Sequence, residues 1–358
     1  MRSRSRSASK TPQNKENQTH KARIVFFETE DWEKQFIQSA ALRKYEARVY
    51  GERLTEETAR LAEDADIVSV FIYSNVDKGV LDKLPNLGMI ATRSTGYDHI
   101  DMAECRRRGI VVSNVPYYGE NTVAEHAFGL ILSLSRKIYK AYFRTTRLDF
   151  SLENLTGFDL KGKSMGVVGA GRIGLHVVRI AKGFGMDVLV YDVRQEPLLA
   201  EVLGFTYVPF EELLRRSDVI SLHVPLVKTT HHMINRSNIH LIKRGALLIN
   251  TARGAVVETE ALISALDQGT IAGAGLDVFE GEESVKEETA LLGQQLPREK
   301  MREILLGYAL LHRDNVVITP HIAFYSEEAL LRIVETTQQN ILGFLQGNPV
   351  NVVATSAM

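Results

Sequence analysis

Short runs of apolar residues alternate with longer stretches of mixed polarity from Ala22 onward. The runs at 23–27, 65–71, 87–92 and 109–113 have the length and the β-branched content of buried strands. Stretches such as "DWEKQFIQSAALRKY" have helical periodicity and lie between these runs. Apolar strands separated by helices predict a parallel sheet that is covered on both faces.

A second series of the same kind follows the motif "FDLKGK", with expected strands at 164–169, 187–192, 218–223, 245–251, 272–278 and 315–319. One long helical stretch, "GENTVAEHAFGLILSLSRKIYKAYFR", separates the two series, and its apolar middle predicts burial. A final amphipathic helix is expected at 325–347, where a glycine ends it. The pattern therefore predicts an α/β protein with two doubly wound, Rossmann-like domains.

Composition narrows the classes of function. The 358 residues carry 43 basic and 44 acidic side chains. The resulting net charge of −1 does not favour a nucleic acid or an anionic membrane as a partner. No apolar run approaches the ~18 residues that span a bilayer. Cys105 is the single cysteine, which rules out an internal disulfide and a cysteine-based zinc cluster, and no metal site is expected. A reducing compartment such as the cytoplasm fits this composition.

Residues 1–21 form a different kind of segment, basic and rich in Ser, Asn and Gln. Such a segment buries too little apolar surface to offset the entropy of ordering, which predicts a disordered tail. It lacks the apolar region of a secretory signal, whereas its Arg and Ser content leaves organellar targeting open.

A glycine motif marks the start of the second series. Gly169, Gly171 and Gly174 have G-x-G-x-x-G spacing between an apolar strand and a helix, and Asp192 ends the following strand. This arrangement predicts a dinucleotide site, with the pyrophosphate at the helix N-terminus. A carboxylate at the position of Asp192 would bind the ribose hydroxyls and repel a 2′-phosphate, which favours NAD over NADP. Arg194, two residues further on, could soften that preference.

Three ionisable residues follow expected strands of the second series: Arg253, Glu282 and His321. Each alone has a structural explanation, as a surface arginine, a solvated acid and a core histidine with bonded nitrogens. Ligands in such sheets bind outside the carboxyl ends of the strands, where all three residues lie. Together they indicate a catalytic site.

The motifs "RSTGYDHID", "NVPYYGENTVAEH", "GVVGAGRIG", "SDVISLHVPLVKTTHHMI", "LINTARGAVV", "GLDVFEGEE" and "ITPHIAFYS" resemble those of the D-isomer-specific 2-hydroxyacid dehydrogenases. The resemblance extends from about Ala22 to Asn351 and is closest to the D-lactate dehydrogenase branch. It implies a flavodoxin-like substrate domain, residues 22–117 and 321–351, split around a central NAD-binding domain, residues 118–320. Residues 352–358 are expected to be a tail. A homodimer through the NAD domain is implied too, and the apolar helix at 126–135 favours it.

The family resemblance also implies the role of each site residue. In the reduction of a 2-oxo acid, His321 would donate a proton, Glu282 would hold the imidazole in its charged form, and Arg253 would grip the substrate carboxylate. The implied substrate-binding residues are Thr95, Gly96, Tyr118 and Phe324. The implied cofactor-binding residues, besides the three glycines and Asp192, are Arg172, Ile173, Val224, Pro225, Thr251, Ala252 and Asp277.

Several substrates and one other class of function remain open. The implied activity is reduction of pyruvate to D-lactate with NADH, because the long insertion between Glu282 and His321 is typical of the lactate branch. Glyoxylate or hydroxypyruvate, a branched 2-oxo acid, phosphoglycerate and formate are alternatives. Formate fits poorly, because the formate branch has an uncharged amide in place of Glu282. A corepressor that binds NAD(H) to assemble partners is the alternative from another class.

Overall fold

The computed structural model describes residues 21–37, 42–282 and 297–353, so the basic tail of residues 1–20 lies outside them. The chain divides into two compact units: residues 1–116 with 333–358, and residues 117–332. The sequence predicts these boundaries at 117/118 and 320/321. The second one falls later, at 332/333, and Ile322 N and Ala323 N donate hydrogen bonds to Asp277 within the second unit. Among the described residues, no helix combines the length and the apolarity needed to cross a membrane.

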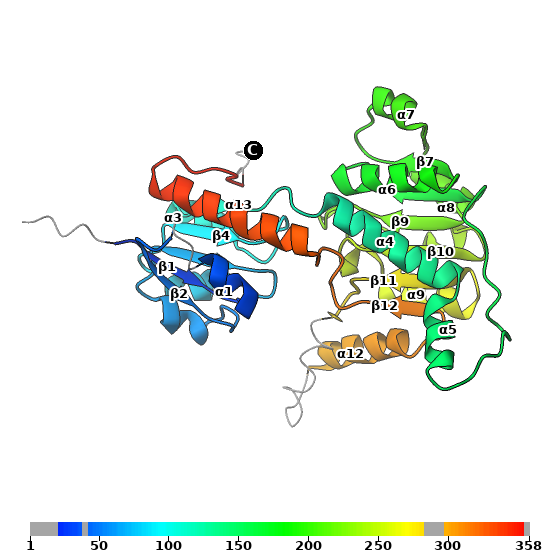
Figure 1. The fold of residues 1–358 in the computed structure, drawn as a ribbon, viewed down its shortest axis with the longest axis horizontal. Coiled ribbons are helices and arrows are strands. Elements are labelled where there is room, and N and C mark those ends of the chain that lie inside the picture. Colours follow the sequence, from blue (N-terminus) through cyan, green and yellow to red (C-terminus); the bar gives the residue numbers. More distant parts are fainter. Residues whose placement is uncertain (1–20, 38–41, 283–296, 354–358) are drawn as a thin grey trace, which may run out of the picture. The chain divides into compact units, whose positions relative to one another are not determined.

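The described residues of the first unit form a parallel five-stranded sheet in the order β2-β1-β3-β4-β5 (Figure 1). This is the flavodoxin-like order that the family resemblance implies. The strands are β1 Arg23–Phe26, β2 Glu46–Val49, β3 Ile67–Val70, β4 Met89–Thr92 and β5 Val111–Ser113. The helices are α1 Asp31–Ile37, η1 Thr58–Ala62, α2 Lys78–Asp82, α3 Met102–Arg108 and the C-terminal part of α13 Glu327–Leu345.

Alternation along β1 shows how both faces of this sheet are covered. Ile24 and Phe26 belong to one buried cluster with Ile37 of α1 and Ile341 of α13. Val25 and Phe27 belong to the other cluster, with residues of α2 and α3. The sequence did not indicate β2, because its residues "EARV" form an edge strand without an apolar run. Val352 forms a bridge with Ser113 and Val353 is buried, so these two residues of the expected tail at 352–358 belong to the folded unit, and the other five lie outside the described residues.

The described residues of the second unit form a parallel seven-stranded sheet in the order β12-β11-β10-β9-β6-β7-β8. The strands are β6 Ser164–Val168, β7 Asp187–Tyr191, β8 Thr206–Tyr207, β9 Val219–Leu222, β10 Ala246–Asn250, β11 Ile271–Leu276 and β12 Val316–Ile318. The helices are α4 Glu120–Ser135, α5 Ile138–Thr145, α6 Arg172–Gly183, α7 Pro197–Leu203, α8 Phe210–Arg216, η2 Ile239–Leu241, η3 Gly254–Val256, α9 Thr259–Asp267 and α12 Arg298–Leu311.

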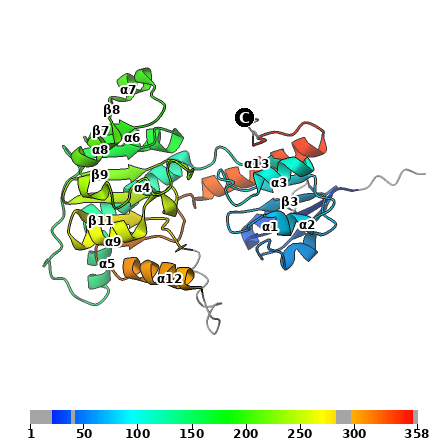
Figure 2. The same ribbon diagram turned by 180° about the vertical axis from the view of Figure 1, so that it is seen from behind.

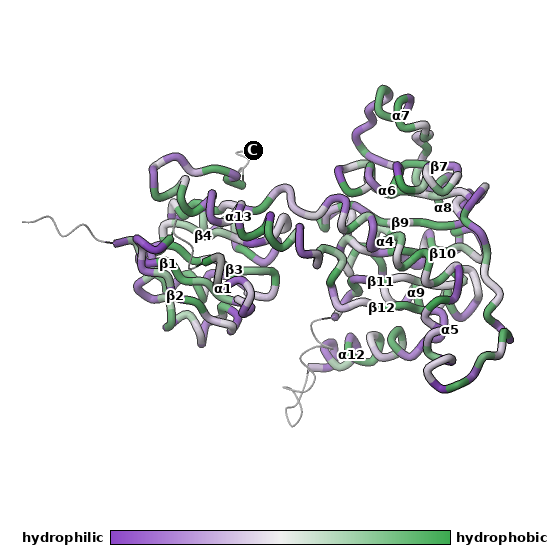
Figure 3. Tube along the Cα trace, viewed as in Figure 1, coloured by the Kyte–Doolittle hydropathy of each residue, from purple (hydrophilic) through white to green (hydrophobic). Residues whose placement is uncertain are grey.

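Two layers of helices enclose this second sheet, as Figures 1 and 2 show. Helices α4 and α6 share one buried cluster with β6 and β7, whereas α8 and α9 share the other with β9, β10 and β11. The strands are largely hydrophobic along the tube of Figure 3. The strand order reverses at β6, since β7 and β8 lie on one side of it and β9 to β12 on the other. Ligands of doubly wound sheets bind at such a reversal.

The long helix expected between the two series is interrupted. α4 ends at Ser135 and α5 begins at Ile138, directly after Lys137, which has φ of 56°, so the single predicted helix is two helices. The apolar middle of the stretch lies in α4 and is buried inside the second unit, as predicted.

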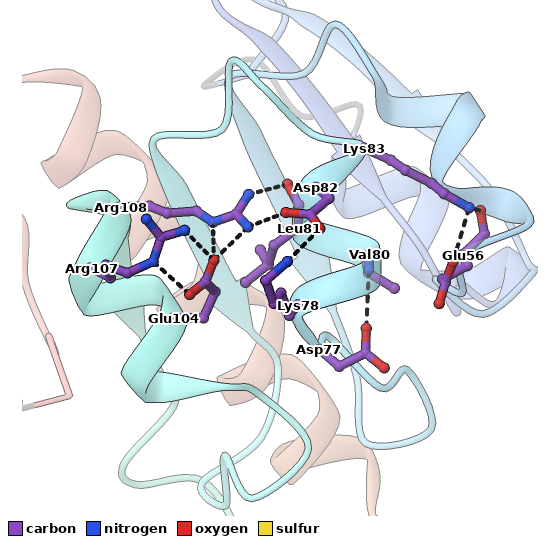
Figure 4. A network of polar contacts seen from close by, with 10 residues as sticks. All are labelled: Glu56, Asp77, Lys78, Val80, Leu81, Asp82, Lys83, Glu104, Arg107 and Arg108. Atoms are coloured by element: carbon purple, nitrogen blue, oxygen red, sulfur yellow. Dashed lines mark hydrogen bonds and ion pairs between the residues drawn. The ribbon is translucent and has the colours of Figure 1, made fainter.

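A charged network ties α3 to α2 in the first unit (Figure 4). Glu104 accepts hydrogen bonds from Arg107 at 2.6 and 2.8 Å and from Arg108, which also donates to Leu81 O and Asp82. The hydrogen bonds from Arg107 and then Arg108 lower the pKa of Glu104 from 4.5 to about 2.

This shift predicts a pH-dependent contribution to stability. A lowered folded-state pKa stabilises the fold fully above the unfolded value of 4.5, and the contribution disappears as the pH falls towards about 2. Glu104→Gln should therefore lower the urea midpoint at pH 7, and its difference from the parent should shrink steadily below pH 4.5. The exposed Glu57→Gln is the control and should change little. An equal difference at both ends of the pH range would contradict the charge-based explanation.

Candidate functional site

The predicted catalytic residues follow three neighbouring strands of the second unit. In the register of β10, β11 and β12, Asn250 lies beside Leu276, and Leu276 lies beside Ile318. Arg253 comes three residues after Asn250, and His321 comes three residues after Ile318. Glu282 comes six residues after Leu276. The register therefore delivers all three segments to the same edge of the sheet.

His321 and Glu282 are in direct contact. The imidazole Nδ1 lies 3.2 Å from Glu282 Oε1, and the two side chains are only 20% and 15% exposed. A carboxylate on Nδ1 fixes the orientation of the ring. The opposite nitrogen, Nε2, is then the atom that can exchange a proton with a substrate.

Asp277 holds the turn that carries His321. Its buried carboxylate accepts hydrogen bonds from Thr319 Oγ1 at 2.5 Å and from the N–H groups of Ile322 and Ala323 at 2.9 Å. The N–H of His321 donates to Asp277 O at 3.0 Å. His321 has φ of 59°, in the left-handed region that few non-glycine residues adopt, and these bonds hold it there. The cofactor-binding role implied for Asp277 stays a prediction.

His126 is a polar member of this site that the sequence analysis missed. From the buried helix α4, its Nε2 lies 2.9 Å from Thr319 Oγ1 and 3.5 Å from Asp277 Oδ1. The available signal was a lone histidine in the otherwise apolar stretch "HAFGLIL". The ring extends the network around Asp277, which makes it a residue that positions the His321 turn.

Arg253 immediately precedes the short helix η3. Asn250 Nδ2 donates to Arg253 O at 2.9 Å, and Arg253 Nη1 donates to Ala252 O at 2.8 Å. A Cβ on Gly254 would lie 2.3 Å from the backbone of Phe279, so only glycine allows this close approach. The segment of Arg253 is therefore packed directly against the segment that leads to Glu282.

The predicted substrate-binding residues fall in both units. Tyr118 and Phe324 meet in the second unit, with ring centroids 6.1 Å apart in an edge-to-face arrangement. Thr95 and Gly96 follow β4 in the first unit, where Thr95 Oγ1 donates to Val115 O and Ser94 Oγ donates to Gly96 O. A role in substrate binding stays a prediction for all four residues.

The three glycines of the motif pack the loop closely at two positions and leave it open at the third. Gly169 has φ of 99°, and a Cβ on it would lie 2.7 Å from His223 O. A Cβ on Gly174 would lie 1.9 Å from Gly169 O, which explains the close packing of α6 on β6. A Cβ on Gly171 meets nothing within 4 Å, so open space lies above the first turn of α6. Backbone N–H groups at a helix start beside open space suit a phosphate.

Two buried polar atoms lie at the carboxyl ends of β9 and β10, next to this loop. Within the described part of the chain, His223 Nδ1 and Thr251 Oγ1 have no hydrogen-bond partner. Burial lowers the pKa of His223 to about 3, so its ring is neutral. Unpaired buried polar atoms are rare, and a bound ligand with hydroxyl or amide groups would explain these two. The residues present therefore fit a dinucleotide.

Asp192 follows β7 as predicted. Its Oδ2 accepts the N–H of Ala170 in the glycine loop at 2.6 Å, and its Oδ1 accepts the N–H of Arg194 at 2.8 Å. Each oxygen retains a lone pair that can accept a hydrogen bond from a ribose hydroxyl group. The side chain of Arg194 is paired with Glu196 at 3.0 Å, which directs its charge to that carboxylate.

The remaining predicted cofactor residues surround the same loop. Arg172 begins α6, where its guanidinium stacks 3.5 Å from the ring centroid of Tyr117 and lies 3.7 Å from Glu120. A Cβ on Gly169 would lie 3.0 Å from Val224 Cγ1, so Val224 packs on the loop. Ile173, Pro225 and Ala252 belong to the first turn of α6 and to the segments after β9 and β10.

A family model describes most of the second unit. Residues 128–323 match the D-isomer specific 2-hydroxyacid dehydrogenase NAD binding domain. The glyoxylate reductase of Thermococcus litoralis is 40% identical over 298 residues, which cover 81% of this chain and 84% of that protein. The D-lactate dehydrogenase of Escherichia coli is 35% identical over 331 residues, which cover 91% of this chain and 97% of that protein.

A solved structure also matches both units. The crystal structure of D-lactate dehydrogenase from Aquifex aeolicus, complexed with NAD and lactic acid, has a TM-score of 0.82 and 39% sequence identity. The match covers 92% of this chain and 99% of that one.

Proposed function

Because the chain belongs to the D-isomer-specific 2-hydroxyacid dehydrogenase family and is an NAD-dependent oxidoreductase, we propose that it reduces pyruvate to D-lactate with NADH. The contact between His321 and Glu282, on the sheet edge that also carries Arg253, supports this proposal most directly. Bound NADH supplies the hydride for the carbonyl carbon.

The side chains supply the remaining chemistry. Arg253 forms a bidentate pair with the substrate carboxylate and stabilises the negative charge that grows on the carbonyl oxygen. His321 Nε2–H donates its proton to that oxygen, so hydride and proton together convert the ketone to an alcohol. Glu282 holds the ring in position during this step, and solvent restores the proton afterwards. The aromatic pair of Tyr118 and Phe324 offers an apolar surface to the methyl group of the substrate.

A panel of 2-oxo acids tests the substrate. NADH oxidation should show the highest kcat/KM with pyruvate, ahead of glyoxylate, hydroxypyruvate and branched 2-oxo acids. A higher value with glyoxylate would favour the second candidate, which the relative from Thermococcus litoralis supports. Tight NADH binding without turnover of any member would instead favour a binding protein of the corepressor kind.

Asp192 predicts a preference between the two nicotinamide cofactors. Its fixed carboxylate repels a 2′-phosphate, so kcat/KM should be at least about tenfold higher with NADH than with NADPH, a difference of about 1.4 kcal/mol. Asp192→Ser should narrow this ratio. Asp187→Ser, at the opposite end of β7, is the matched control and should leave it unchanged. Equal values for both cofactors in the parent protein would contradict the role of Asp192.

We propose a homodimer through the second unit, although the helix that first favoured it is unsuitable. That helix, α4, is buried within its own unit. Exposed apolar side chains lie instead on α5 and the segment after it, namely Tyr142, Phe143, Leu148, Phe150 and Leu152. Sedimentation should give a dimer mass for the parent protein and a monomer mass for Phe150→Asp with Leu152→Asp. The exposed Leu198→Asp on α7 is the control and should remain dimeric.

This proposal assigns cofactor binding and the proton donor to the second unit. A role of Thr95 and Gly96, in the first unit, in binding the substrate stays a prediction. We propose a cytoplasmic location, because a chain with the single cysteine Cys105 fits a reducing compartment.

A further inference from the structure

Two adjacent histidines and a glutamate form a cluster on the second unit, outside the set of residues used above. His232 Nε2 lies 2.7 Å from Glu280 Oε1, and the rings of His231 and His232 have centroids 4.0 Å apart. One ligand atom from each of the three residues lies within 4.8 Å of the others. We propose that His231, His232 and Glu280 bind one divalent transition-metal ion, with zinc as the ion that fits best.

The donor atoms determine the class of ion. Two imidazole nitrogens and one carboxylate oxygen are a set that zinc accepts, with water at the fourth position. Magnesium and calcium prefer oxygen ligands, whereas imidazole suits zinc, copper and nickel. Metal–ligand bonds of about 2.0–2.2 Å place neighbouring ligand atoms about 3.4 Å apart in a tetrahedron. Small side-chain rotations can bring the ligand atoms to this spacing. They would widen the 2.7 Å contact between His232 Nε2 and Glu280 Oε1 and shorten the longest separation between ligand atoms, which is at most 4.8 Å.

Backbone contacts already hold the three residues in place. The N–H of His232 donates to Ala255 O at 2.8 Å, Asn235 Nδ2 donates to His232 O at 2.8 Å, and the N–H of His231 donates to Val227 O at 2.9 Å. Glu280 Oε2 accepts the N–H of Thr259 at 3.4 Å. Little ordering is therefore required when an ion binds, and the exposed ring of His231 gives the ion access from solvent.

The cluster is also connected to the proposed catalytic pair. Glu280 lies two residues before Glu282, and Gly281 between them has φ of 80°. An ion that enters between His232 and Glu280 must separate the two atoms that are now 2.7 Å apart. Because Glu280 and Glu282 share one short segment, we expect the rotation of Glu280 onto the ion to disturb the contact between Glu282 and His321, so zinc should inhibit turnover. This consequence rests on the proposed function, whereas the binding itself does not.

Binding is tested with zinc alone on the full-length protein without an affinity tag. Calorimetry should give one Zn²⁺ per chain, and Co²⁺ should give the visible absorption of a site with imidazole ligands. His231→Ala leaves the contact between His232 and Glu280 intact, yet it should weaken zinc binding by at least about tenfold, the loss that removal of even an outer-shell partner causes. Glu280→Gln should do the same. The control is the exposed His240→Ala, which should bind like the parent protein.

The outcomes separate this proposal from the proposed function. Absence of stoichiometric zinc binding, or equal affinity in the parent and His231→Ala proteins, would overturn the site. Without metal, His231→Ala should reduce pyruvate as fast as the parent, and micromolar zinc should inhibit the parent more strongly than the variant. Zinc binding by a protein that reduces no 2-oxo acid would refute the proposed function and leave the metal site standing.

Discussion

Replacing His321 with asparagine should lower kcat for pyruvate reduction by about 10²–10⁴-fold, the usual contribution of a positioned general acid. Asparagine tolerates the left-handed backbone that His321 adopts, with φ of 59°, so the turn around Asp277 should persist. The side-chain amide has no proton that it can give up near neutral pH, which removes the step assigned to the imidazolium. Steady-state kinetics with pyruvate and NADH provide the measurement.

Two controls separate catalysis from folding in this experiment. The His321→Asn protein should still bind NADH, because the glycine loop and Asp192 are unchanged. His312→Asn replaces an exposed histidine at the end of α12 and should keep parental turnover. Near-normal kcat in His321→Asn would return His321 to a structural role, and the proton would then have to come from another group or from water.

A substitution of Glu282 tests the partner of this histidine. Glu282→Gln keeps the shape of the side chain and removes the carboxylate 3.2 Å from His321 Nδ1. The ring then loses the group that orients it, so kcat/KM for pyruvate should fall. An unchanged kcat/KM would show that Glu282 does not position His321.

Replacing Arg253 with alanine should reduce kcat/KM for pyruvate by about 10²–10³-fold or more, the loss expected when a preorganised donor to a developing oxyanion is removed. The variant also lacks the fork that holds the substrate carboxylate, so KM should rise while kcat falls. NADH binding should change little. Single-turnover and steady-state measurements distinguish the two effects.

Lysine at this position gives a sharper test than alanine alone. Arg253→Lys retains the charge without the planar pair of donors, so it should recover only part of the lost kcat/KM. The matched control is Arg244→Ala, two residues before β10 begins, whereas Arg253 comes three residues after that strand ends. If Arg253→Ala and Arg244→Ala behave alike, Arg253 does not contact the substrate.

Much of the fold could be predicted because its signals are local. Apolar runs such as "SMGVV" and "ALLIN" are buried strands whatever surrounds them, and the motif at Gly169, Gly171 and Gly174 combines a strand, a turn and a helix within one short segment. The errors in the predicted helices and strands also have local causes. The edge strand β2 has too few apolar residues to be recognised, and the left-handed Lys137 divides a helix whose periodicity continues through it.

The sequence by itself determined which residue types follow which strands, and hence that Arg253, Glu282 and His321 belong to the carboxyl ends of a parallel sheet. Tertiary structure decided which side chains touch. Glu282 and His321 are 39 residues apart, and His126 reaches Thr319 across 193 residues. The same is true of Glu280, which joins His231 and His232 only in the folded chain. Periodicity records the local backbone, whereas these contacts depend on the strand order β10-β11-β12 and its register, which arise when distant segments pack together.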